Sequence, residues 1–177
     1  MNGLGNGGSV RFKVGEKVVY PSQGVSVVEE IADEELGGTT MSCYHLRLLN
    51  TDSKVVVPVA NAERVGLRPL SQKSAVDRAM RRLRAAEGDE ADNWKDRYRA
   101  NLDRIKTGDL DEVVDVLLCL ADVARRKTLS FRERKMFDHA RQLLVYEVAA
   151  VKGKPAEKVE RDIEKALQVQ PEPVDEG

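Results

Sequence analysis

The sequence is poor in the residues that form metal sites and disulfide bonds. Its 177 residues include two cysteines, Cys43 and Cys119, and two histidines, His45 and His139. The cysteines lie far apart and form no Cys-x-x-Cys pair, so the ligands are too few and too widely spaced for a structural zinc site or a disulfide framework. We therefore expect no metal or other cofactor, and a reduced, cytoplasmic setting.

Long hydrophobic runs are also absent, and no stretch approaches the length needed to cross a bilayer. Residues 1–11 are rich in glycine and lack the hydrophobic segment of a signal peptide, which predicts a flexible leader. Residues 169–177 are acidic and contain proline, which predicts a disordered tail. The expectation is a soluble, monomeric protein that makes no contact with membranes.

The motifs of common enzymes are missing as well. There is no Gly-x-x-x-x-Gly-Lys loop, no nucleophile elbow and no paired metal ligands. The 29 basic and 30 acidic residues leave a net charge of -1, so the whole protein should not hold DNA by bulk electrostatics. We expect a protein that is not an enzyme, and any contact with nucleic acid must be local.

Residues 12–70 have the pattern of short strands. Pro21 and Gly24 bracket a tight turn between two β-branched runs. Further on, Leu46 and Leu48 alternate with polar residues, as in a half-buried strand. Four or five strands in about sixty residues predict a small twisted barrel of SH3 or Tudor type.

Residues 71–168 change to a helical period and predict a compact bundle of about five helices. Glu112 and Glu133 each lie three residues after a capping residue, in capping-box register. The boundary residues are the N-caps Ser71, Asp109 and Ser130, the helix ends Gly88, Gly108 and Gly153, and Pro155 as the opening of the last helix. Strands followed by helices favour two separate domains over an interleaved sheet.

The single tryptophan, Trp94, should stand in the first turn of the second helix. An aromatic wedge beside cations suits nucleic acid. Periodicity also places Trp94 on one helical face with Tyr98, Leu102 and Ile105, a pattern typical of an apolar core. Periodicity alone favours the core, and both interpretations remain open at this point.

Two cationic groups occur in the helical half. They are either ordinary solvent-facing helix positions or, if they converge in space, a patch able to hold a few phosphates. The first group is Lys95, Arg97, Arg99, Arg104 and Lys106, and the second is Arg125, Arg126, Lys127, Arg132, Arg134 and Lys135.

Several motifs of both halves resemble the bacterial CarD/CdnL family. The resemblance extends from about Phe12 to Leu167 and keeps the family's order. In the first half the matching segments are residues 12–25, Val57-Pro58 and residues 61–68, which resemble the RNA polymerase-interaction domain. In the second half they are Asn93-Trp94, Arg97-Tyr98, residues 106–108, Leu129-Ser130 and residues 133–136.

The resemblance implies a transcription factor that binds the β subunit of RNA polymerase through a Tudor-like domain. Its helical domain would then contact promoter DNA at the upstream edge of the transcription bubble and stabilise the open complex without reading sequence. Trp94 matches the family's wedge, and Arg97 and Arg99 match cations that contact the DNA backbone. With the cationic groups, the predicted DNA-binding residues are Trp94, Lys95, Arg97, Arg99, Arg104, Arg132, Arg134 and Lys135.

The resemblance also implies a polymerase-binding surface around Cys43 and the strand near Val56, with an exposed strand edge offered for pairing. The predicted polymerase-binding residues are Cys43, Val55, Val56, Val57 and Pro58.

The chain departs from the family pattern at a few positions. Asp96 stands where members commonly carry an arginine, and Cys43 occupies a position that is aromatic in some members. Glu34 and Val56 match arginines that anchor polymerase in other members. The alternative is therefore that the protein is a divergent paralogue, and that it acts as a protein-protein adaptor with weak or no DNA binding. A fragment of the transcription-repair coupling translocase is disfavoured, because no nucleotide-binding motif occurs.

Overall fold

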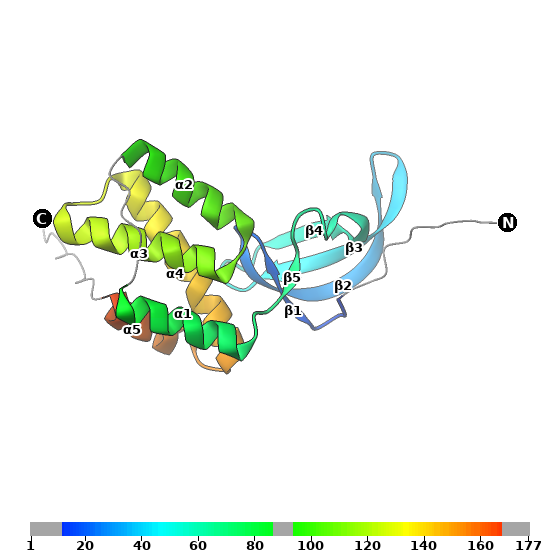
Figure 1. Cartoon of the computed structure of the whole chain (residues 1–177). Helices are drawn as coiled ribbons and strands as arrows, with labels where there is room; N and C mark the ends of the chain where they lie inside the picture. Colours follow the sequence, from blue (N-terminus) through cyan, green and yellow to red (C-terminus); the bar gives the residue numbers. More distant parts are fainter. Residues whose placement is uncertain (1–11, 87–93, 168–177) are drawn as a thin grey trace, which may run out of the picture. The chain divides into compact units, whose positions relative to one another are not determined.

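The computed structural model describes residues 12–86 and 94–167, which form two compact units with their boundary between Leu70 and Ser71 (Figure 1). For Trp94 only the backbone is described. The predicted leader at residues 1–11, the predicted helix end at Gly88 and the predicted tail at residues 169–177 lie outside the described residues. No helix in the described ranges is long and apolar enough to cross a membrane.

The first unit is a five-stranded antiparallel sheet with the strand order β4-β3-β2-β1-β5. The strands are β1 (Lys17–Tyr20), β2 (Gly24–Leu36), β3 (Thr39–Leu48), β4 (Lys54–Pro58) and β5 (Arg68–Pro69), and the 3-10 turn η1 (Val59–Asn61) follows β4. The predicted barrel is not confirmed. In the described chain β4 pairs with β3 alone and the very short β5 pairs with β1 alone, so the sheet stays open and β4 is an edge strand.

The predicted alternation in β3 is confirmed. Tyr44 and Leu46 are buried in the sheet's core, while His45 and Arg47 between and after them are partly exposed. The Tyr44 ring packs edge-on against Phe12 with a centroid distance of 5.8 Å, and its hydroxyl accepts a hydrogen bond from the Phe12 amide. These contacts attach the beginning of the described chain to the sheet.

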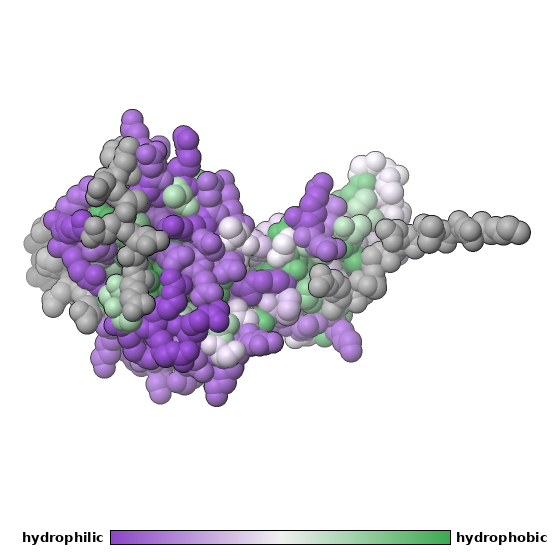
Figure 2. All heavy atoms as spheres, viewed as in Figure 1, coloured by the Kyte–Doolittle hydropathy of each residue, from purple (hydrophilic) through white to green (hydrophobic). Residues whose placement is uncertain are grey.

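The second unit consists of five helices in the described residues, as predicted. They are α1 (Lys73–Ala85), α2 (Trp94–Thr107), α3 (Leu110–Arg126), α4 (Phe131–Lys152) and α5 (Ala156–Leu167). Helix α3 packs against each of the other four and supplies the centre of the core, because its residues are apolar almost all round. Figure 2 shows hydrophilic side chains over most of the visible face of this unit.

Most of the predicted helix ends are confirmed. The Asp109 carboxylate accepts hydrogen bonds from the amides of Asp111 (2.8 Å) and Glu112 (3.3 Å) and so caps α3. Gly108 and Gly153 both adopt the left-handed conformation expected of glycines at helix ends, with φ of 71° and 62°.

The predicted N-cap at Ser71 is wrong. Gln72 precedes α1 without a side-chain cap, and Ser71 instead binds Glu147 of α4. The Ser71 hydroxyl and amide donate to the same Glu147 carboxylate oxygen at 2.6 and 3.0 Å. Glu147 is 3% exposed, and a buried carboxylate without donors costs more than an unmade surface cap.

We predict that Gly66→Ala destabilises the sheet unit more than Gly15→Ala. Both glycines have positive φ, 78° and 87°, but a Cβ on Gly66 would lie 3.0 Å from the Pro21 ring, whereas nothing lies within 4 Å at Gly15. The backbone strain alone costs about 1–3 kcal/mol, and Gly66→Ala adds the collision. Amide hydrogen exchange of residues 12–70 measures both variants. Equal losses would show that the Pro21 contact is without consequence.

Candidate functional site

A buried ion pair joins the first turns of α2 and α4. Arg97 Nη2 donates to Glu133 Oε1 at 2.9 Å, and the two side chains are only 6% and 4% exposed. The Ser130 hydroxyl accepts a bond from the Glu133 amide, and the Ser130 amide donates to Glu133 Oε2, which completes the predicted capping box of α4. The Glu133 carboxylate therefore caps α4 and also binds α2 through Arg97.

The Glu133 carboxylate is charged in the folded protein. Burial alone would raise the pKa of Glu133, but the hydrogen bond from Arg97 and those involving Ser130 outweigh burial and lower this pKa below its ordinary value. Arg97 was predicted to contact the DNA backbone, whereas here its guanidinium is turned into the bundle. Its charge neutralises Glu133 and positions α2.

The ion pair joins the first turns of two helices that each carry exposed cations. The axes of packed helices lie about 8–10 Å apart, a separation that a few nucleotides can span. The exposed cations that flank the pair are Lys95 and Arg99 on α2 and Arg132, Arg134 and Lys135 on α4. We call these five residues the cationic surface. Asp96 is also exposed beside them and opposes their charge.

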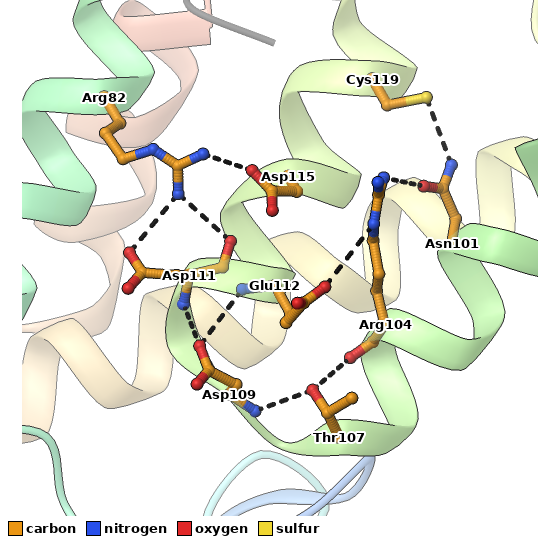
Figure 3. A network of polar contacts seen from close by, with 9 residues as sticks. All are labelled: Arg82, Asn101, Arg104, Thr107, Asp109, Asp111, Glu112, Asp115 and Cys119. Carbon is orange, nitrogen blue, oxygen red and sulfur yellow. Dashed lines mark hydrogen bonds and ion pairs between the residues drawn. The ribbon is translucent and has the colours of Figure 1, made fainter. Parts of the chain in front are cut away.

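Arg104 takes part in a contact between α2 and α3. It stands seven residues after Arg97, about 10 Å further along α2, and is half-buried in a network between α2 and α3 (Figure 3). Its Nη1 donates to Asn101 Oδ1 at 3.3 Å, and its Nε lies 3.6 Å from a Glu112 carboxylate oxygen. Asn101 in turn donates to the buried Cys119 sulfur at 3.4 Å. The structure thus shows the Arg104 side chain in contacts within α2 and between α2 and α3.

The same close-up shows how α1 is attached to α3. Arg82 of α1 pairs with Asp115, and its Nη1 donates to the carboxylate and the backbone oxygen of Asp111 at 3.4 and 3.3 Å (Figure 3). These contacts hold helices together and contain no feature of a ligand site. In residues 12–86 and 94–167 no group of three or more His, Cys, Asp or Glu could hold a metal ion.

The apolar face predicted for the second helix is confirmed below Trp94. Ile105 is 3% exposed, and the half-buried Tyr98 and Leu102 pack against the core of the bundle. The side chain of Trp94 lies outside what the structure describes, so its predicted role as a wedge stays a prediction.

Phe131 is a residue that the sequence reasoning missed. It is the first residue of α4 and is 73% exposed. The ammonium of Lys135 lies 4.5 Å from the centre of its ring. The sequence did contain the signal: with Ser130 as N-cap, the core face of α4 begins at Met136 and Phe137, and Phe131 is a large aromatic residue outside that face.

The predicted polymerase-binding residues meet around edge strand β4 but point in different directions. Val56 is 44% exposed, and Val55 and Pro58 are half-buried. Val57 and Cys43 are buried in the sheet at 3% and 0% exposure. Val56 is thus the most exposed of these five side chains, and Cys43 is buried on β3 opposite Pro58 of β4.

The surroundings of the Cys43 thiol disfavour its ionised form. Burial raises its pKa, and the nearby carboxylates of Glu34 and Asp33 raise it further. Its sulfur lies 3.6 Å from the Met41 carbonyl oxygen, to which the thiol donates. A protonated, buried thiol at neutral pH packs as a small apolar residue.

We predict that Glu133→Gln destabilises the helical unit by about 3–5 kcal/mol, because it leaves the Arg97 charge buried without its counter-ion. Glutamine still fits the capping box, so the loss reports the ion pair. Adding Arg97→Met should recover part of the stability. As a control, Asp138→Asn breaks the more exposed pair with Arg141 (3.0 Å) and should cost less than about 1 kcal/mol. Urea unfolding measures the free energy of unfolding of wild type and of the three variants.

The same variants test how the stability of the helical unit depends on pH. Because the folded-state pKa of Glu133 is lowered, its stabilisation is complete above the unfolded-state value of about 4.3. It is lost as the pH falls through the lower folded-state pKa. Wild type should therefore lose stability in this acid window more steeply than the Arg97→Met/Glu133→Gln double variant. Identical acid profiles would contradict an ionised pair.

Two families of known proteins match the chain, one for each unit. The family described as CarD-like/TRCF RID domain matches residues 12–71, and the family described as CarD, C-terminal domain matches residues 78–164. A Bacillus subtilis (strain 168) protein with the name Putative transcription factor YdeB is 30% identical over 142 residues, which cover 80% of this chain and 93% of that protein. With both units matched in order and a relative matched along nearly its whole length, the chain belongs to the CarD/CdnL family of transcription factors.

Proposed function

We propose that this protein binds the β subunit of RNA polymerase through the outer edge of β4 and stabilises the promoter open complex through α2 and α4. The DNA contact is independent of sequence and lies at the upstream edge of the transcription bubble. Membership of the CarD/CdnL family and the match of the first unit to a polymerase-interaction family support the polymerase contact. The observation that supports the DNA contact is the Arg97–Glu133 pair, which joins the first turns of α2 and α4, where the five residues of the cationic surface are exposed.

The edge of β4 has the properties of a strand-pairing site. Unpaired backbone groups on an edge strand supply hydrogen bonds to an added strand, and the exposed side chains between them supply selectivity. Val56, which is 44% exposed on this edge, is suited to an apolar position on the partner strand. Val57 and Cys43 contribute by fixing β4 on the sheet.

The net charge of -1 limits what the protein does to DNA on its own. A few phosphate contacts give weak, salt-sensitive and sequence-independent binding. Attachment to polymerase raises the effective concentration of the helical unit at the promoter to the order of millimolar. The cations therefore act after docking, when the DNA is already close.

Stacking supplies the preference for melted DNA. An aromatic side chain stacked on an unpaired base contributes about 1–3 kcal/mol, and each 1.4 kcal/mol corresponds to about a tenfold change in an equilibrium constant. Trp94, at the start of α2, is the proposed wedge. Because its contact exists only when a base is unstacked, the open state gains stability and the closed duplex does not.

The adaptor function remains the second candidate because Asp96 is exposed among the cations. A carboxylate there repels phosphate and attracts a basic protein surface. Polymerase binding that is retained without any effect of the helical unit on the lifetime of open complexes would favour this candidate.

We predict that Val56→Glu abolishes capture of the protein by RNA polymerase. A buried, unpaired carboxylate at a pairing edge costs several kcal/mol, while the exposed position leaves the isolated sheet folded. Val14→Glu is the matched control, because Val14 is 60% exposed in the same unit but precedes β1. Retained capture with Val56→Glu would show that polymerase docks elsewhere.

We predict that Trp94→Ala shortens the lifetime of polymerase-promoter complexes under heparin challenge about tenfold, by loss of stacking. Polymerase capture should be unchanged, which separates this effect from docking. Trp94→Phe keeps a ring and should keep most of the lifetime. An unaltered lifetime with Trp94→Ala would rule out the wedge.

A further inference from the structure

Phe131 is unusual in the helical unit. Among the described side chains of this unit, it is the large hydrophobic one that remains exposed, at 73%, while the other strongly exposed ones belong to the sheet unit. An exposed phenylalanine does not contribute the hydrophobic stabilisation that the buried apolar residues of the fold provide. Its exposure is therefore better explained by a contact with another molecule than by stability.

The ring stands on a rigid support. Phe131 directly follows the Ser130 cap, and the two reciprocal hydrogen bonds of the capping box, 3.2 and 3.3 Å long, fix the turn that carries it. Glu133 of this box is also the residue that holds Arg97 and the start of α2. The position of Phe131 is thus set by the contact that defines the cationic surface.

The surroundings of the ring select a nucleic acid base. The Lys135 ammonium covers one side of the ring at 4.5 Å, which leaves the opposite side for stacking. Arg132 and Arg134 are exposed next to it, and the acid between them, Glu133, is buried and neutralised. An apolar protein partner would have to bury these cations, whereas a nucleotide satisfies the ring with its base and the cations with its phosphate.

We propose that Phe131 is a second stacking platform, which takes an unpaired base of DNA while Arg132, Arg134 and Lys135 contact the adjoining phosphates. This inference rests on the proposed function, because it assumes that α2 and α4 meet promoter DNA. Bases inside a duplex are stacked on their neighbours and cannot be reached by the Phe131 ring, so the platform selects a strand that has been opened. It adds a contact on α4 to the one proposed for Trp94 on α2.

The test compares binding of the full chain to a forked DNA with unpaired bases and to a fully paired duplex of the same sequence. Phe131→Leu keeps apolar bulk without a ring face, and Phe131→Trp enlarges the face. We expect Phe131→Leu to weaken fork binding about tenfold and to leave duplex binding unchanged, and Phe131→Trp to bind the fork at least as tightly as wild type. Leu36→Ala, at another exposed apolar position (41%), is the control and should change neither affinity.

Charge reversal separates this inference from the function on which it rests. Arg99→Glu and Arg132→Glu should weaken binding to both DNAs, with circular dichroism confirming the fold. If they do and Phe131→Leu leaves the fork-to-duplex ratio unchanged, the platform is wrong and the proposed DNA contact stands. If none of these variants alters binding, the DNA contact itself is wrong.

The same variants are also compared by the lifetime of open complexes in the presence of polymerase. There the attachment of the protein to polymerase compensates for its weak affinity for DNA. The platform requires Phe131→Leu to shorten that lifetime, and an unchanged lifetime overturns it.

Discussion

The buried pair between Arg97 and Glu133 determines what the helical unit can present. Without it, Glu133 would place a negative charge in the middle of the exposed cations of α4, and α2 would lack its contact with the first turn of α4. A buried ion pair is a poor source of stability, since desolvation cancels much of the attraction. Its benefit is geometric, because the two charged groups tolerate one relative position of the helices far better than any other.

Helix α2 depends on polar contacts more than its neighbours do. Its buried face carries Arg97 and Asn101 as well as Ile105, and its half-buried Arg104 pairs with Glu112 (Figure 3). Apolar faces can slide with little change in energy, whereas directional hydrogen bonds fix the register. An element that must hold a side chain at a defined place on DNA benefits from this kind of attachment.

The two proposed contacts of the protein use different physics for different purposes. Strand pairing at β4 is directional and resists salt, because its main-chain hydrogen bonds are shielded within the interface. The contact of the cationic surface with phosphates is long-ranged and falls steeply with salt. With a net charge of -1, the proposed function assigns the choice of promoter to docking on polymerase and the effect on the open complex to the cations.

Local signals made the helix ends predictable. The caps at Asp109 and Ser130 depend on residues two or three positions away, so the sequence contains everything that they need. Ser71 has an equally good local signal, but its partner Glu147 lies 76 residues along the chain. A short-range rule cannot foresee a competitor that only the tertiary fold brings near.

The residue types of the candidate site could be read from the sequence, but the direction in which each side chain points was harder to predict. Charge alone cannot distinguish Arg97, which is buried, from Arg99, which is exposed. The phase of the helix could have done so, because Arg97, Asn101 and Ile105 follow one another at intervals of four and share the inner face. In β4 a run of three valines carries no alternation, and only the pairing of Val57 with Tyr44 identifies the residue that faces the core.

The spacing of the two aromatic residues follows from the same ion pair. Trp94 begins α2 and Phe131 begins α4, and the Arg97–Glu133 contact joins the first turns of both helices. Under the proposed function, two stacking residues that begin joined helices would have little use on a uniform duplex, in which no base is available. They would have a use where a duplex meets an opened strand, because there the unpaired bases occupy defined positions and each ring can be satisfied only if the other is correctly placed. Under the proposed function, the buried charge pair, whose net contribution to stability is small, serves to hold the geometry with which the helices would bind melted DNA.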